Sequence, residues 1–369
     1  MNSTPRFLLF ILLFFTLSAN GQSGSETTEE ATETEEKHIR LFALPLVFYG
    51  PETRLGFGAA GVAAFDWKKS LPTDRPSQVQ LGFAYTLNKQ LLFYIPYQFF
   101  TPGEQWSFSG ELGYYKYFFY YYGNGFSALD MPEETYNVNF PRLRFRSLYQ
   151  LKQQHFVGIQ YWYDDFRNLE YRTGGILDVT QPIGVNGGRV SGLGPVYLLD
   201  TRNNIFSPDK GSYIEVSTLI NAPWLGSDFS FQKLILDART YISKKPEQVL
   251  ALQLYGEFTS GEPPFFQLAQ LGGNKRLRGY IEGRVRDNQY LMVQAEFRQH
   301  LFWRIGMTAF VAYGGVAEKI SALSPAQSVW AAGLGLRVLL LKEDRINVRF
   351  DAGFGKKTSG YYLTVTEAF

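Results

Sequence analysis

The chain has 369 residues, of which 45% are hydrophobic and 17% aromatic, and its formal net charge is +2. This small net charge argues against nucleic-acid binding. The chain has no Cys, which excludes thiol catalysis and disulfides. It has only three His, far apart in the sequence, which disfavours a metal site built from histidines. We therefore expect no cofactor and no metal. The length allows several ordinary domains or one large β architecture.

Residues 1–21 have the features of an export signal. Arg6 precedes an apolar run from Phe7 to Leu17, and small residues follow at Ala19 and Gly21. The apolar run is shorter than the roughly 20 residues that a membrane-spanning helix needs. We expect a signal peptide at 1–21 and an acidic, disordered periplasmic tail at 22–40, too short for a folded periplasmic domain.

The chain from residue 41 onward alternates between apolar and polar residues. In 345–354, for example, Ile346, Val348 and Phe350 alternate with polar residues such as Asn347 and Arg349. Only β-strands place successive side chains on opposite faces in this way. Aromatic residues gather at segment ends, as in 118–122, and resemble the interface girdles of a membrane barrel. The pattern predicts an all-β protein, a transmembrane antiparallel barrel over 41–369 that is polar inside and apolar outside.

Single-chain bacterial barrels have an even number of strands, so we expect sixteen. The sixteenth strand is either Arg40–Tyr49 or part of 166–180. The other fifteen are predicted near 53–66, 77–85, 90–98, 105–118, 139–150, 154–166, 188–201, 211–221, 227–243, 247–258, 288–301, 305–315, 328–340, 344–354 and 360–369.

The longest predicted connection lies between the eleventh and twelfth strands. Long connections without their own secondary structure are usually functional or disordered. This one contains Arg278, Gly279 and Tyr280. The Arg-Gly-Tyr sequence in such a loop resembles the signature of the Omp85 superfamily, also called the bacterial surface antigen family. The resemblance implies a loop that folds into the barrel, where acidic residues of the inner wall bind its arginine.

Further segments carry the same resemblance. Family members often have an acidic residue at the position of Ala312, so the loop arginine needs another partner. Glu296 and Asp351 both point toward the predicted lumen, and we expect one or both to pair with Arg278. The other matching segments are a strand-turn motif with Asp200, Arg202, Pro208 and Gly211, the closing strands around Gly333–Arg337 and Arg349–Asp351, and the terminal Phe369, which resembles the recognition signal for barrel assembly.

The resemblance also implies a location and a role. We expect an integral protein of the bacterial outer membrane that contacts outer-membrane lipids and lipopolysaccharide, the barrel assembly machinery, and periplasmic or lipoprotein partners. Its non-enzymatic role would be the assembly or translocation of outer-membrane proteins or lipids, with the first and last strands as a weak lateral junction. The alternative is a passive channel for small solutes. An enzyme is disfavoured because no nucleophile elbow or paired acid and base is present.

Overall fold

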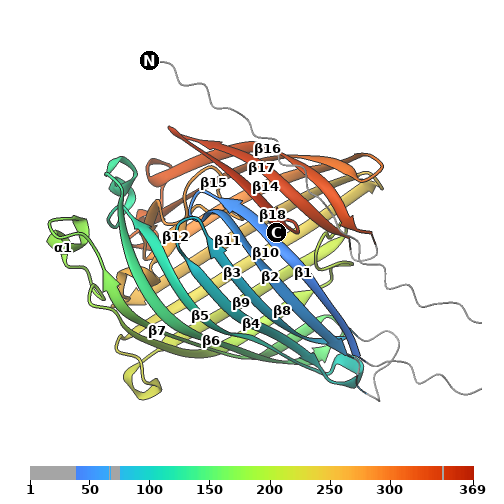
Figure 1. The fold of residues 1–369 in the computed structure, drawn as a ribbon, viewed down its shortest axis with the longest axis horizontal. Coiled ribbons are helices and arrows are strands. Elements are labelled where there is room, and N and C mark those ends of the chain that lie inside the picture. The colour runs from blue at the N-terminus through green and yellow to red at the C-terminus, as the bar shows by residue number, and fades with distance from the viewer. Residues whose placement is uncertain (1–38, 66, 68–74, 343–344) are drawn as a thin grey trace, which may run out of the picture. The chain divides into compact units, whose positions relative to one another are not determined.

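The computed structural model describes residues 39–65, 67, 75–342 and 345–369. The predicted signal peptide, and all of the predicted acidic tail except its last two residues, lie outside this part of the chain. Sixteen antiparallel strands form a closed barrel, in which neighbours follow chain order (Figure 1). The predicted fold class is confirmed. No helix in the described residues is long and apolar enough to cross a bilayer.

The elements of the barrel are listed here in chain order. They are β1 (Ile39–Gly50), β2 (Arg54–Phe65), β3 (Ser77–Thr86), β4 (Leu91–Phe100), β5 (Trp106–Tyr121), β6 (Glu134–Lys152), β7 (His155–Glu170), β8 (Gly188–Asp200), β9 (Gly211–Asn221), β10 (Phe231–Lys245), β11 (Gln248–Gly261), β14 (Gln289–Phe302), β15 (Ile305–Ala317), β16 (Ser328–Leu341), β17 (Ile346–Gly355) and β18 (Thr358–Val365). Two short strands, β12 (Ala269–Leu271) and β13 (Val285–Asp287), lie between β11 and β14 and pair with each other. The one α-helix in the described residues, α1 (Ile176–Thr180), lies between β7 and β8.

The sixteenth strand is the first of the two predicted alternatives. It is β1, which begins at Ile39, two residues before the predicted start of the barrel, and pairs with β2 along its whole length. The other candidate, 166–180, is divided between the end of β7 and α1. Sequence alternation alone did not separate the two, because 41–49 is apolar throughout and 166–180 shows no regular alternation.

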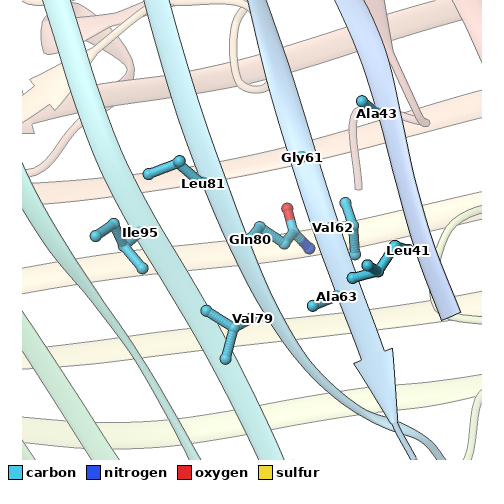
Figure 2. Close-up of a pocket in the computed structure, with 9 residues that line it drawn as sticks. All are labelled: Leu41, Ala43, Gly61, Val62, Ala63, Val79, Gln80, Leu81 and Ile95. Carbon is cyan, nitrogen blue, oxygen red and sulfur yellow. The ribbon is translucent and has the colours of Figure 1, made fainter. Parts of the chain in front are cut away.

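The two faces of each strand differ in polarity and exposure. On β14, Leu291, Val293 and Phe297 are exposed on the outer face, whereas Glu296 and Arg298 are buried on the inner face. On β2 the outward residues Ala59, Gly61 and Ala63 are small, and Gly61 has no atom within 4 Å of where a Cβ would lie. The outer wall is therefore hollowed there. Figure 2 shows this apolar hollow of about 670 Å³, lined by Leu41, Ala43, Gly61, Val62, Ala63, Val79, Gln80, Leu81 and Ile95.

The aromatic run near the end of β5 does not lie wholly at the membrane interface. Tyr121 is buried in an inward-facing cluster, against which Phe119 packs. Tyr121 also meets Phe265, which belongs to the connection after β11, with ring centroids 5.2 Å apart. The prediction that 118–122 forms an outer girdle is wrong for Phe119 and Tyr121, because alternation along a strand sends every second aromatic ring inward.

Candidate functional site

The connection between β11 and β14, residues 262–288, is largely buried. Its apolar side chains Leu271, Leu277 and Val285 are 0% exposed and belong to one cluster with residues of β14, β15 and β16. The β12–β13 hairpin brings the two halves of the connection together. Burial against the inward faces of these strands fixes the segment 276–282, which contains the predicted Arg-Gly-Tyr motif.

Arg278 is the centre of the site. Its side chain is 0% exposed, its Nη1 lies 2.6 Å from Asp351 Oδ2, and its Nη2 is hydrogen bonded to Glu296 Oε2. The guanidinium also lies over the ring of Phe310, with its central carbon 3.5 Å from the ring centroid. A buried guanidinium is tolerated only when carboxylates and aromatic faces replace water, and this site supplies both. The structure thus brings together Arg278 and both acidic residues proposed as its partners.

The two carboxylates also bind three arginines from the barrel wall. Asp351 Oδ1 accepts a hydrogen bond from Arg337 Nη1 at 2.7 Å, and Asp351 Oδ2 lies 3.1 Å from Arg349 Nη1. Glu296 Oε1 accepts a hydrogen bond from Arg298 Nε at 2.8 Å. Each carboxylate is therefore shared between the loop and the wall. Removal of either one would take a carboxylate away from more than one buried arginine.

The rest of the motif is bound through its backbone and the tyrosine hydroxyl. Gly279 has φ +117°, and Tyr280 Oη donates to Trp330 O at 3.1 Å and accepts from Lys356 N at 2.8 Å. The motif can approach β17 because of two glycines that sequence reasoning missed. A Cβ on Gly353 would lie 2.4 Å from Arg278 O, and one on Gly355 would lie 2.3 Å from the Tyr280 ring.

Ala312 explains why the wall uses other carboxylates. It is buried in the same apolar cluster as Tyr280, while Phe310, two residues earlier on β15, stacks on Arg278. The acidic function is supplied by β14 through Glu296 and by β17 through Asp351.

The predicted strand-turn motif lies between β8 and β9. Arg202 Nη2 pairs with Asp200 Oδ2 at 2.8 Å, and Gly211 has φ +95°, with Thr201 O only 2.1 Å from where a Cβ would lie. Pro208 O accepts a hydrogen bond from Arg298 Nη1 at 3.4 Å. The motif is therefore connected to the ion pairs around Arg278 through Arg298.

The last four residues turn away from the strand that was predicted to contain them. The predicted strand to Phe369 is too long, because β18 ends at Val365 and Thr366 has φ +69°. Glu367 Oε2 then accepts from Arg337 Nε at 2.7 Å, and Phe369 O accepts from Arg298 Nη2 at 2.8 Å. Electrostatic attraction to inward-facing arginines explains the turn. Phe369 is buried inside, in a cluster with Tyr241 and Ala251, and sequence reasoning missed the role of Glu367.

The junction between β1 and β18, which we call the seam, is the weakest in the barrel. β1 pairs with β2 at twelve positions but with β18 only at Tyr49 and Leu363. β18 pairs with β17 at eight positions. Few backbone hydrogen bonds can therefore hold the two edges of the seam together, and the apolar hollow of Figure 2 lies close to it on β1–β4.

Comparison with known proteins agrees with this geometry. Residues 77–354 match the Omp85 superfamily domain. The structure is similar to BamA from Haemophilus ducreyi lacking POTRA domains 1–3, with 16% identity and a TM-score of 0.60 over 90% of this chain and 70% of that one. It is also similar to CdiB from Acinetobacter baumannii (13% identity, TM-score 0.58, 89% of this chain and 60% of that one). A third similar structure is CdiB from Escherichia coli (11% identity, TM-score 0.61, 90% of this chain and 64% of that one).

At these identities the structural likenesses establish the fold alone, and the chain spans less than two thirds of both CdiB chains. No curated protein sequence matches the chain. The fold and the buried loop define an outer-membrane barrel of Omp85 type. Because the domain match covers most of its length, the chain belongs to the Omp85 superfamily.

Proposed function

We propose that this protein acts, without enzymatic chemistry, in the assembly or translocation of outer-membrane proteins or lipids, as one member of a complex. Its mechanism uses the seam as a lateral opening in the barrel wall, while the loop around Arg278 braces the wall strands β14–β17 beside it. The single pair between Tyr49 and Leu363 is the observation that carries the proposal. A strand edge with so few partners can exchange its hydrogen bonds with a client strand or let a lipid pass.

The filling of the barrel favours this role over a passive channel. Apolar parts of the loop pack inside against β14–β16, and aromatic rings of β5 and β6 meet Phe265 and Phe266. Phe369 fills a further part of the interior beside Tyr241. An open channel for small solutes needs a continuous aqueous path, which these buried groups narrow.

The test is depletion of the protein in its native host, followed by quantification of outer-membrane proteins and surface lipopolysaccharide. The proposal predicts that the amount of outer-membrane proteins or of surface lipopolysaccharide falls before growth stops. It also predicts that purification of the protein in gentle detergent recovers a partner in a constant ratio to it. Unchanged protein and lipid content would contradict it. A large, stable conductance of the purified barrel in planar bilayers, increased by deletion of the loop, would favour the channel instead.

A further inference from the structure

The β18 edge of the seam is hydrogen bonded to the loop. Gly279 N donates to Tyr362 Oη at 2.9 Å, and the same hydroxyl donates to Tyr280 O at 3.3 Å. Thr358 Oγ1 donates to Gly279 O at 2.8 Å. Tyr362 is 0% exposed, so these bonds form away from water and define the position of the loop on this strand.

The β1 edge is bound to the same loop a few residues further along. Glu282 N donates to Glu52 Oε1 at 2.7 Å, and Glu52 lies in the turn that joins β1 to β2. The turn is itself held by its neighbour, because Glu52 O accepts from Asn88 Nδ2 at 3.0 Å and from Gln90 Nε2 at 3.4 Å. The Glu52 backbone is therefore held by the β3–β4 turn, and the Glu52 carboxyl is held by the loop.

We propose that loop residues 279–282 tether the two edges of the seam toward the end of the barrel that carries the β1–β2 and β17–β18 turns, with Glu52 as the anchor on the β1 side and Tyr362 as the anchor on β18. The proposal deepens the proposed function, since it names what holds the lateral opening closed. β1 and β18 make few direct hydrogen bonds with each other, and the tether connects them through hydrogen bonds to the loop. Glu52 is a positioning residue that acts through the Glu282 backbone.

The surroundings of Glu52 make the tether sensitive to pH. The ionisable groups that interact electrostatically with it are Glu282 of the loop, Tyr117 and Tyr120 of β5, and Tyr362 of β18. Tyr49 of β1 and Arg54 of β2 flank its own turn, and Lys89 lies in the β3–β4 turn that packs against it. Burial, with a smaller contribution from the charge of Glu282, raises the pKa of the Glu52 carboxyl to about 7. A neutral Glu52 carboxyl still accepts the hydrogen bond from Glu282 N. An ionised Glu52 carboxylate is in addition repelled by the charge of Glu282, which weakens the tether.

Hydrogen exchange of the full chain in outer-membrane vesicles tests the tether. Peptides covering 46–50 and 360–365 report opening of the two edges, and β10–β11 serves as an internal reference. We expect Glu52→Ala to speed exchange about fivefold in both peptides, as the loss of one hydrogen bond implies. Glu52→Gln should match the wild type at pH 6, because its amide oxygen can accept from Glu282 N. Thr53→Ala, whose hydroxyl bonds only to Arg54 O, is the control.

The decisive readout lies across the seam from the substitution. If Glu52→Ala speeds exchange in 46–50 but leaves 360–365 at the wild-type rate, Glu52 orders only its own turn and the tether is overturned. Tyr362→Phe provides the reverse test, since it should speed exchange in 46–50. Faster exchange at both edges with normal assembly of outer-membrane proteins and lipids would support the tether and contradict the proposed function. Unchanged exchange would contradict the tether alone.

Discussion

Arg278 and Asp351 are 73 residues apart in the chain, yet their Nη1 and Oδ2 atoms lie 2.6 Å apart and both side chains are 0% exposed. The pair joins the loop after β11 to β17, the strand next to the β18 edge of the seam. Because each partner also binds Glu296 or a wall arginine, the pair orders several elements at once.

Arg278→Ala should lower the heat resistance of the folded barrel. The substitution leaves Glu296 and Asp351 buried with one cation fewer, and breaking a buried pair costs about 3–5 kcal/mol. The temperature at which the barrel loses its folded mobility in gel electrophoresis measures this. Arg304→Ala, at an exposed turn, is the matched control and should behave as the wild type. An equal transition temperature for both variants would show that the Arg278 pairs contribute nothing to stability.

Glu296→Gln and Asp351→Asn should each destabilise the barrel, and each effect should be smaller in the Arg278→Ala background than in the wild type. The reason is that both carboxylates lose the same partner in the background that lacks the arginine. A double-mutant cycle should give coupling energies of about 1–3 kcal/mol for each carboxylate with Arg278. Chemical denaturation of the refolded barrel in detergent supplies the values. Purely additive effects would contradict shared binding of the guanidinium.

Gly353→Ala should displace the loop. The new Cβ would lie 2.4 Å from Arg278 O, a backbone atom that cannot rotate away, and such overpacking costs about 1–3 kcal/mol. Limited proteolysis of the 262–288 connection should become faster. Gly61→Ala provides the comparison, because nothing lies within 4 Å of its Cβ position. Equal proteolysis of the two variants would mean that the loop does not need this close approach to β17.

The contribution of Glu52 to stability should fall as the pH rises. Its carboxyl has a pKa raised from 4.5 to about 7 by burial, so the folded state disfavours ionisation. The stabilising contribution of Glu52 is therefore fully present below about pH 4.5 and is lost as the pH rises through 7. The unfolding temperature of the wild type should decrease relative to Glu52→Gln between pH 5 and 8. A constant difference between the two proteins would show that Glu52 does not titrate in this range.

The last residues should be protected in the folded barrel. Glu367 is held by Arg337 and by Asn347 Nδ2 at 2.8 Å, and Phe369 is 5% exposed. We expect carboxypeptidase to release Phe369 slowly from the wild type and about tenfold faster from Glu367→Ala, as the loss of charged hydrogen bonds implies. Glu247→Ala, in an exposed turn, is the control. Rapid release from the wild type would contradict the buried position of the C-terminal residues.

Local alternation was sufficient to predict the barrel and most of its strands. A strand such as β17 shows its two faces in ten consecutive residues, so Asp351 could be assigned to the inner face from sequence alone. Alternation also assigns Glu296 to the inner face, whereas Arg278 is identified by the family resemblance of its loop. Their side chains meet in the structure.

Other contacts inside the lumen could not be predicted from alternation, because they join residues that are not neighbours along a strand. Alternation predicted that Phe369 closes a strand, but attraction of Glu367 to Arg337 turns the chain inward after Val365. Similarly, nothing local connects Glu52 to Glu282, which is 230 residues away. The need for glycine at position 353 becomes evident only once the structure places Arg278 O against it.

The most direct test of the lateral opening is to lock the seam. Tyr49 and Leu363 are paired positions on β1 and β18, and the chain has no other Cys, so Tyr49→Cys with Leu363→Cys allows a specific disulfide. In the native host, we predict that the oxidised double variant stops outer-membrane protein or lipid assembly and that a reductant restores it, while each single variant stays active. Normal assembly with the disulfide fully formed would contradict a function that depends on opening between these strands.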